Sequence, residues 1–411
     1  MSRINPFNKG PLSIGYDNCL DLCFGMDSQV GEIIDTIKNS DESDLINFFI
    51  YGEPGVGKTS LINMVQYLVS DKKTKTEMDK QEMLRNELFY VIGNNICSEN
   101  TNLGDVLNPI IEQLKKGLRI NKFILETITG SLKIKIPAFV EVGVEAKFSN
   151  SKPSIVQNIM DQFYNILCKL FDKIEMIDGS GLVIVLEDID FLISNEGFVS
   201  EIKIIIEKIS LKYNKKLILI LSGLPESYEK FLSETNGIDG YFKGIELLNL
   251  EENEMNVYLD RGKKVDKTIN DEAKNIIFKY SGGNISLAAH IANETLAVSN
   301  TKNIIDKENV EEALVRIKKQ HIRKIIGILK RLDSWHIFIL KVLNESSDGI
   351  QYSDLKDEMI YTLEDCDESI VKSCINKLKS KQLIYVQDGI IYIINKLVED
   401  TLREALLNEQ Y

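Results

Sequence analysis

Apolar residues follow two kinds of spacing along this chain, and the change from one to the other divides it into regions. From Asn47 to about Leu250, short continuous apolar runs alternate with segments in which apolar residues recur at helical spacing. Continuous runs are typical of strands buried on both faces, so the alternation predicts an α/β domain with a parallel sheet between helices. The predicted strands are Phe48–Tyr51, Leu88–Ile92, Leu182–Leu186, Leu217–Leu221 and Ile245–Leu248. The predicted helices are Ser28–Lys38, Thr59–Val69, Leu103–Leu118, Ile155–Phe171 and Phe198–Tyr213.

One segment inside this domain has a different pattern. Between about residues 131 and 148, apolar and polar residues alternate on either side of Pro137. Such alternation predicts a β-hairpin inserted into the domain. The hairpin would serve either as a contact for a partner or nucleic acid, or as surface decoration, and the sequence favours neither.

After Leu250 the spacing becomes helical throughout. From about Gln320, further helical segments are followed by two short apolar strands joined through Asp388-Gly389, a strong hairpin turn signal. Helices followed by a hairpin indicate a winged helix. The predicted domains are therefore a core over residues 1–250, a helical lid over 251–319 and a winged-helix domain over 320–411.

The strongest chemical signal lies between the first predicted strand of the core and the helix that follows. It fits the phosphate-binding loop pattern G-x-x-x-x-G-K-[ST]. Glycines let the backbone N–H groups turn inward toward an anion, and the helix start adds a partial positive charge. We expect the loop to bind ATP, with Lys58 reaching the β- and γ-phosphates and the Thr59 hydroxyl holding Mg²⁺. The nucleotide-binding residues are Gly52, Glu53, Pro54, Gly55, Val56, Gly57, Lys58, Thr59 and Ser60.

A second signal follows the apolar strand Leu182–Leu186, which ends in Glu187, Asp188 and, two residues later, Asp190. A buried strand that delivers carboxylates at its end is how phosphate-loop enzymes hold Mg²⁺ and orient the attacking water. We therefore predict that this strand end lies beside the phosphate loop.

With both signals present, the chain resembles AAA+ ATPases of the replication-initiator type and their relatives, the STAND ATPases, over about residues 20–400. Those families end this strand in Asp-Glu or Asp-Asp, whereas the order here is Glu-Asp. The resemblance implies that Glu187 holds the metal and that Asp188 polarises the water. It also implies that Ser222, after the strand Leu217–Leu221, senses the γ-phosphate, although Ser222 could instead simply begin the turn at Gly223.

The chain also departs from these families. Lys243 stands where relatives commonly have an arginine finger, and a lysine lacks the bidentate fork that suits a transferring phosphoryl group. Met26 replaces the arginine of the segment that precedes the core, and Ile285 replaces the proline of the Gly-Asn-Pro motif that opens the lid helix. The lid helix offers no arginine as a second sensor. These departures predict slow ATP hydrolysis by the isolated chain.

Charge bears on the choice of partner. The 411 residues include 49 basic and 62 acidic ones, a net charge of −13, whereas proteins that grip DNA nonspecifically usually have the opposite balance. Residues 320–411 hold twelve basic and fifteen acidic residues, a net charge of −3. The would-be recognition helix does carry a basic face, so DNA contact and protein docking both stay open for the winged helix. That face comprises Lys372, Lys377, Lys379 and Lys381.

The sequence contains no apolar run long enough to cross a bilayer, and its N-terminus lacks the apolar core of a signal peptide. The six cysteines have no zinc-site spacing and the three histidines are far apart, which predicts a cytoplasmic protein with reduced thiols and no zinc site.

Together these features predict an ATP-dependent molecular switch, with Mg²⁺ as cofactor, that assembles with itself or with protein partners. The alternative is a DNA-binding initiator or loader ATPase that acts as an oligomer on duplex DNA. A metabolic enzyme is disfavoured, because no substrate-transforming constellation accompanies the ATPase residues.

Overall fold

The computed structural model describes residues 7, 25–39, 46–69, 90–97, 103–117, 155–174, 181–213, 216–299, 303–346, 349–363 and 365–407. The hairpin predicted near residues 131–148 lies outside these ranges. The chain forms two compact units, which we call the sheet unit and the helical unit. The sheet unit is Pro11–Leu248, and the helical unit is Asn249–Tyr411 together with Met1–Gly10.

The sheet unit is built on five parallel strands in the order β2-β3-β4-β1-β5. The α/β fold with a parallel sheet is therefore confirmed. Strand β3 is buried at every position, as expected for a central parallel strand. The strands are β1 (Asn47–Gly52), β2 (Tyr90–Ile96), β3 (Gly181–Glu187), β4 (Lys216–Gly223) and β5 (Phe242–Leu247).

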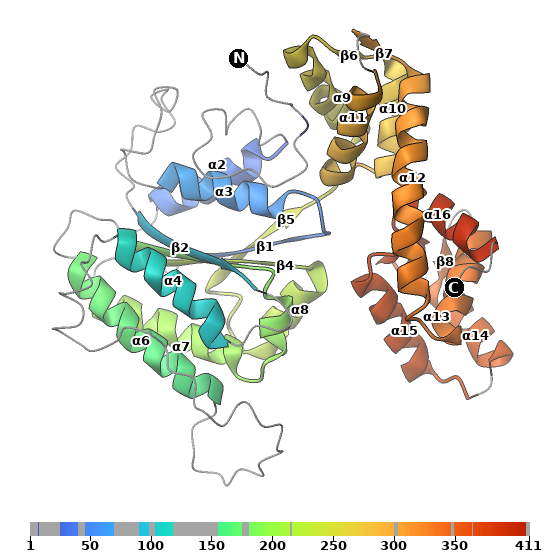
Figure 1. Ribbon diagram of the computed structural model, residues 1–411. Coiled ribbons are helices and arrows are strands. Elements are labelled where there is room, and N and C mark those ends of the chain that lie inside the picture. Colours follow the sequence, from blue (N-terminus) through green and yellow to red (C-terminus); the bar gives the residue numbers. More distant parts are fainter. Residues whose placement is uncertain are drawn as a thin grey trace. The chain divides into compact units, whose positions relative to one another are not determined.

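Helices cover both faces of this sheet (Figure 1). One face packs against α2 (Asp27–Asn39) and α3 (Lys58–Val69), with Ile33, Leu61 and Val65 in that core. Within the described residues, the other face carries four helices, of which the short α8 was not predicted from the sequence. These are α4 (Leu103–Gly117), α6 (Ile155–Ile174), α7 (Phe198–Lys212) and α8 (Pro225–Glu234).

The strand register brings three chain segments together at the carboxyl ends of the strands. Ile50 of β1 pairs with Ser222 of β4, and Leu221 of β4 pairs with Leu186 of β3. Because the strands are parallel, all three end at the same edge. The phosphate loop after β1, Ser222 and Glu187 therefore lie along one line at the end of the sheet.

The helical unit begins with four helices and the short parallel pair β6 (Thr268–Ile269) and β7 (Ile304–Ile305). The lid was predicted to end at residue 319, but its last helix continues to Leu329, because buried positions recur through Ile325 and Leu329. The expected domain boundary at residues 319/320 thus falls within one helix. The four helices are α9 (Glu252–Leu259), α10 (Asp271–Ser281), α11 (Ile285–Ser299) and α12 (Lys307–Leu329).

The remainder of the helical unit joins four helices to a small antiparallel sheet of order β8-β10-β9 around one hydrophobic core. The strands are β8 (Ile350–Gln351), β9 (Ile384–Gln387) and β10 (Ile390–Ile393). The helices are α13 (Ser334–Glu345), α14 (Tyr352–Thr362), α15 (Glu368–Ser380) and α16 (Lys396–Leu407). Of these, α16 was not predicted from the sequence. Across the described ranges, no helix has both the length and the apolar composition needed to span a bilayer.

Candidate nucleotide-binding site

The phosphate loop connects the end of β1 to the start of α3. Gly57 has φ +110°, a conformation that disfavours any side chain, and a Cβ there would lie 2.1 Å from Cε of Met26. A Cβ on Gly52 would lie 2.3 Å from the carbonyl oxygen of Leu247. The loop therefore needs glycine at both positions to follow its path between β5 and the segment before α2.

Lys58 is the first residue of α3, and its side chain folds back over the loop. Its Nζ donates hydrogen bonds to the carbonyl oxygens of Gly52 (2.7 Å) and Glu53 (3.2 Å), and the residue is 8% exposed. Burial lowers the pKa of Lys58, while the charges of Asp188 and Asp190 oppose the shift. The loop thus holds a cation within the field of the carboxylates that follow β3.

Glu187 ends β3 and is only 4% exposed. Burial raises the pKa of its carboxyl group, and a hydrogen bond with the Thr59 side chain counteracts part of the rise. Its Oε2 is buried and has no hydrogen-bond partner among the described residues. The Thr59 hydroxyl and the buried Glu187 carboxylate, which has an unused lone pair, are hard oxygen donors. These two residues therefore fit Mg²⁺.

Asp188 follows in a left-handed backbone conformation, with φ 54° and ψ 50°. This turn directs its backbone N–H to the hydroxyl oxygen of Ser222, at 3.3 Å. The side chain reaches solvent, yet loss of hydration around the carboxyl group raises the pKa of Asp188 while the Lys58 charge opposes it. The left-handed turn thus separates the directions of two consecutive carboxylates.

Asp190 holds the turn that follows β4, a role that the sequence did not reveal. Its Oδ1 accepts hydrogen bonds from the backbone N–H of Leu224 (2.8 Å) and from the hydroxyl of Ser227. A Cβ on Gly223 would come within 2.9 Å of the same oxygen. The motif after β3 and the end of β4 are therefore linked twice, through Ser222 and through Asp190.

Cys97, just after β2, lies where the negative charges of these acids affect its thiol. Its N–H donates to the carbonyl oxygen of Glu187 at 2.8 Å. Burial raises the pKa of the Cys97 thiol to about 12, and the charges of Asp188, Asp190 and Glu187 contribute to the rise. One lysine does not neutralise this group of acids, so the site favours an additional cation.

Lys243 does not join the other predicted site residues. It pairs in register with Phe48 near the start of β5, at the end of the sheet opposite the phosphate loop. Its Nζ contacts Oε1 of Glu32 at 2.9 Å and the hydroxyl of Thr36 at 3.4 Å. The structure thus brings together one group of predicted site residues but leaves Lys243 at the opposite end of the strands. The group comprises Lys58, Thr59, Glu187, Asp188 and Ser222.

Two solved structures are similar in fold over nearly the whole chain. The Walker-type ATPase PABY2304 of Pyrococcus abyssi has a TM-score of 0.58 and 13% identity, covering 97% of this chain and 99% of its own. The ORC2 protein of Aeropyrum pernix, in its ADPNP–ADP complexes, has a TM-score of 0.58 and 11% identity, covering 99% and 98%. At such identities the likeness concerns the fold, and there it agrees with the resemblance to replication initiators.

No curated protein sequence matches the chain significantly. A family model described as the KAP family P-loop domain matches residues 26–390. That span includes the phosphate loop, the acidic end of β3 and most of the helical unit. Since the match extends over far more than half of the sequence, the chain belongs to the KAP family of P-loop domains.

Proposed function

We propose that this protein is an ATP-binding, slowly hydrolysing molecular switch that assembles with itself or with protein partners. The observation that carries the proposal is the convergence of one buried lysine, one hydroxyl and two carboxylates at the ends of β1 and β3. The likeness to the Pyrococcus abyssi ATPase and to an ORC2 protein solved with ADPNP and ADP also supports nucleotide binding.

In this proposal each side chain has a separate role. Lys58 and the backbone N–H groups of residues 52–60 other than Pro54 bind the phosphates, and Thr59 and Glu187 hold Mg²⁺. Asp188 orients the attacking water, and Ser222 fixes the backbone of Asp188 through their hydrogen bond. Bound Mg²⁺ would neutralise negative charge on the phosphates.

Slow turnover is part of the proposal. Among the residues that the structure describes, no arginine takes the place of a finger, and the lysine at the matching position is paired with Glu32 of its own chain. Lys243 would act only on a nucleotide held by another copy of the protein. A missing finger costs about 10³ or more in rate, so a purified chain that hydrolyses ATP faster than roughly 1 s⁻¹ would contradict this part of the proposal.

For the end of the helical unit we propose a winged helix that serves mainly as a docking module. Helices α13–α15 and the antiparallel sheet of β8, β10 and β9 support this assignment. DNA binding remains the second candidate function, because α15 exposes Lys372 and Lys377, followed by Lys381 at its end. Lys372 already pairs with Glu368 at 2.8 Å, which reduces the charge available to a phosphate.

Calorimetric titration of Lys58→Ala with ATP tests the nucleotide site. We expect severe loss of affinity with the fold retained, because Lys58 contacts loop carbonyls rather than an apolar core. The matched control is Lys115→Ala, which removes a lysine of similar exposure (9%) from α4 of the same unit. Unchanged ATP affinity in Lys58→Ala would show that the loop does not bind the phosphates.

A further inference from the structure

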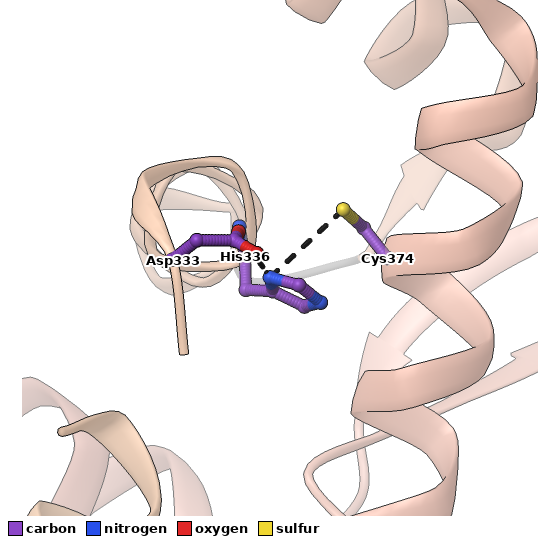
Figure 2. Close-up of side chains that lie close together, drawn as sticks. All are labelled: Asp333, His336 and Cys374. Atoms are coloured by element: carbon purple, nitrogen blue, oxygen red, sulfur yellow. Dashed lines mark hydrogen bonds and ion pairs between the residues drawn. The ribbon is translucent and has the colours of Figure 1, made fainter. Parts of the chain in front are cut away.

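A second group of chemically reactive side chains lies in the helical unit. Asp333 immediately precedes α13, His336 follows one turn later, and Cys374 lies in the middle of α15. Figure 2 shows the imidazole ring of His336 between the Asp333 carboxylate and the Cys374 sulfur. One oxygen, one nitrogen and one sulfur from these residues all lie within 4.8 Å of one another.

The group is largely buried. His336 is 3% exposed and Cys374 is 2% exposed, whereas the Asp333 side chain is 51% exposed. Nδ1 of His336 contacts both Oδ1 of Asp333 and Sγ of Cys374, the latter at 3.9 Å. Nε2 has no hydrogen-bond partner among the described residues, so the polar contacts of the ring are confined to this group.

Through Nδ1, the ring can donate to Asp333 or accept from the Cys374 thiol, but it cannot do both at once. If Nδ1 carries a proton and donates it to Asp333, its lone pair is used and the Cys374 thiol has no acceptor on the ring. If Nδ1 instead accepts from the thiol, it presents a lone pair to a carboxylate oxygen. A cation bound by the Asp333 oxygen, the His336 nitrogen and the Cys374 sulfur would accept a lone pair from each of these three atoms.

We propose that Asp333, His336 and Cys374 bind a divalent transition metal ion, with zinc as the best match. A carboxylate oxygen, an imidazole nitrogen and a sulfur are the three donor types that zinc accepts in proteins. Because the Asp333 side chain is half-exposed, solvent would occupy the fourth coordination position of the zinc ion. The sequence spacing of cysteines and histidines did not predict this group, because Asp333 and His336 lie about 40 positions before Cys374.

Binding would release the thiol proton of Cys374, while the proton of the neutral His336 ring would lie on Nε2. Nδ1 must be unprotonated and Cys374 must become a thiolate. Burial raises the pKa of the Cys374 thiol to about 11, with the charge of Asp333 adding to the rise.

Cobalt(II) is a suitable probe, because a cobalt–thiolate bond gives a charge-transfer absorption that carboxylate and imidazole ligands do not. The titration uses the full-length chain without nucleotide, with Cys19 and Cys23 replaced by serine so that only the four described cysteines can contribute. We expect one equivalent of cobalt, a thiolate charge-transfer band and displacement by zinc. Absence of the band would overturn the proposal.

Variants assign the ligands. Cys374→Ser should remove the band, and Cys168→Ser, which alters a buried thiol in the sheet unit, should keep it. Asp333→Asn preserves a good helix cap but removes the charge, so it should weaken cobalt binding by more than about tenfold without unfolding α13. A band that survives Cys374→Ser or disappears in Cys168→Ser would refute the site. Should Cys374→Ser fail to fold, unchanged cobalt affinity in Asp333→Asn would refute it independently.

Discussion

Glu187 and Asp188 are consecutive residues, but the left-handed backbone at Asp188 points their side chains in different directions. Glu187 meets Thr59 inside the protein, and Asp188 lies within the field of Lys58. This geometry supports the assignment of the metal to Glu187 and of the water to Asp188.

The first prediction follows from that assignment. Asp188→Asn should keep ATP bound and accumulate the assembled state, because the variant retains the phosphate and metal contacts but cannot orient water. Glu187→Gln should weaken the dependence of ATP binding on Mg²⁺. Titrations with and without Mg²⁺, together with sedimentation, measure both effects. The reverse pattern would mean that the two carboxylates have exchanged roles.

The second prediction concerns the pH dependence of stability. Burial raises the pKa of Glu187 above its ordinary value of 4.5, so ionisation disfavours the folded state. The penalty is absent below pH 4.5, grows as the pH rises toward the raised value and is complete above it. Without nucleotide or Mg²⁺, Glu187→Gln should therefore be more stable than the wild type at neutral pH. Thermal unfolding should show this gap narrowing as the pH falls toward 4.5, and a gap that is constant with pH would contradict the argument.

Residues whose chemistry lies in one contiguous stretch could be proposed from the sequence. The phosphate loop and the acids after β3 needed only a motif and a neighbouring apolar strand. Asp190 could not be assigned a role, because its partners Leu224 and Ser227 lie more than 30 positions away. The location of Lys243 depends on where β5 begins: the strand starts at Phe242, three residues before the predicted Ile245, so Lys243 lies within it, opposite Phe48 of β1.

At the scale of elements, the helices of the helical unit are joined by a polar network. Lys318 of α12 contacts Asp400 of α16 at 2.5 Å and the hydroxyl of Tyr280 on α10 at 3.1 Å. Tyr280 also donates to Asp400 at 3.0 Å, and Lys396 contacts the other carboxylate oxygen at 3.2 Å. One carboxylate thus connects three helices.

The third prediction tests this network. Asp400→Ala should lower the free energy of unfolding by roughly 1–3 kcal/mol, because it leaves the partly buried Lys318 without a carboxylate, whereas Lys396 keeps its ion pair with Glu399. Denaturant unfolding measures the loss. Glu312→Ala is the matched control on α12: it removes an exposed pair with Arg316 and should change stability by less than about 0.5 kcal/mol. Equal effects of the two variants would show that the network does not hold the helices together.

The pattern of apolar residues predicted elements well where it was continuous. All five strands of the parallel sheet lie where the apolar runs occur. The far end of α12 was missed because exposed charged residues separate Ile317 from Ile325 and hide the helical spacing. Helix α16 was missed because its mixed composition resembles a charged tail, although Leu397, Leu402 and Ala405 are fully buried.

At the scale of the whole molecule, charge distinguishes the two candidate functions. The net charge of −13 repels nucleic acid, and the basic face of α15 is small. A protein partner with a small acidic patch could use the same lysines against weaker long-range repulsion, because its charge density is far lower than that of duplex DNA. The docking function is therefore the better supported of the two.

The final prediction separates these functions with one double variant. Lys377→Glu with Lys381→Glu should abolish self-association or capture of a protein partner, while ATP affinity stays unchanged because every proposed nucleotide contact lies in the sheet unit. Lys330→Glu with Lys341→Glu makes the same change in net charge at exposed positions outside α15 and should keep the association. DNA binding by the wild type should be negligible at physiological salt. If duplex DNA instead binds with a log–log salt slope of about −2 to −4, and the Lys377/Lys381 variant alone removes it, these lysines contact phosphates and the initiator or loader function is correct.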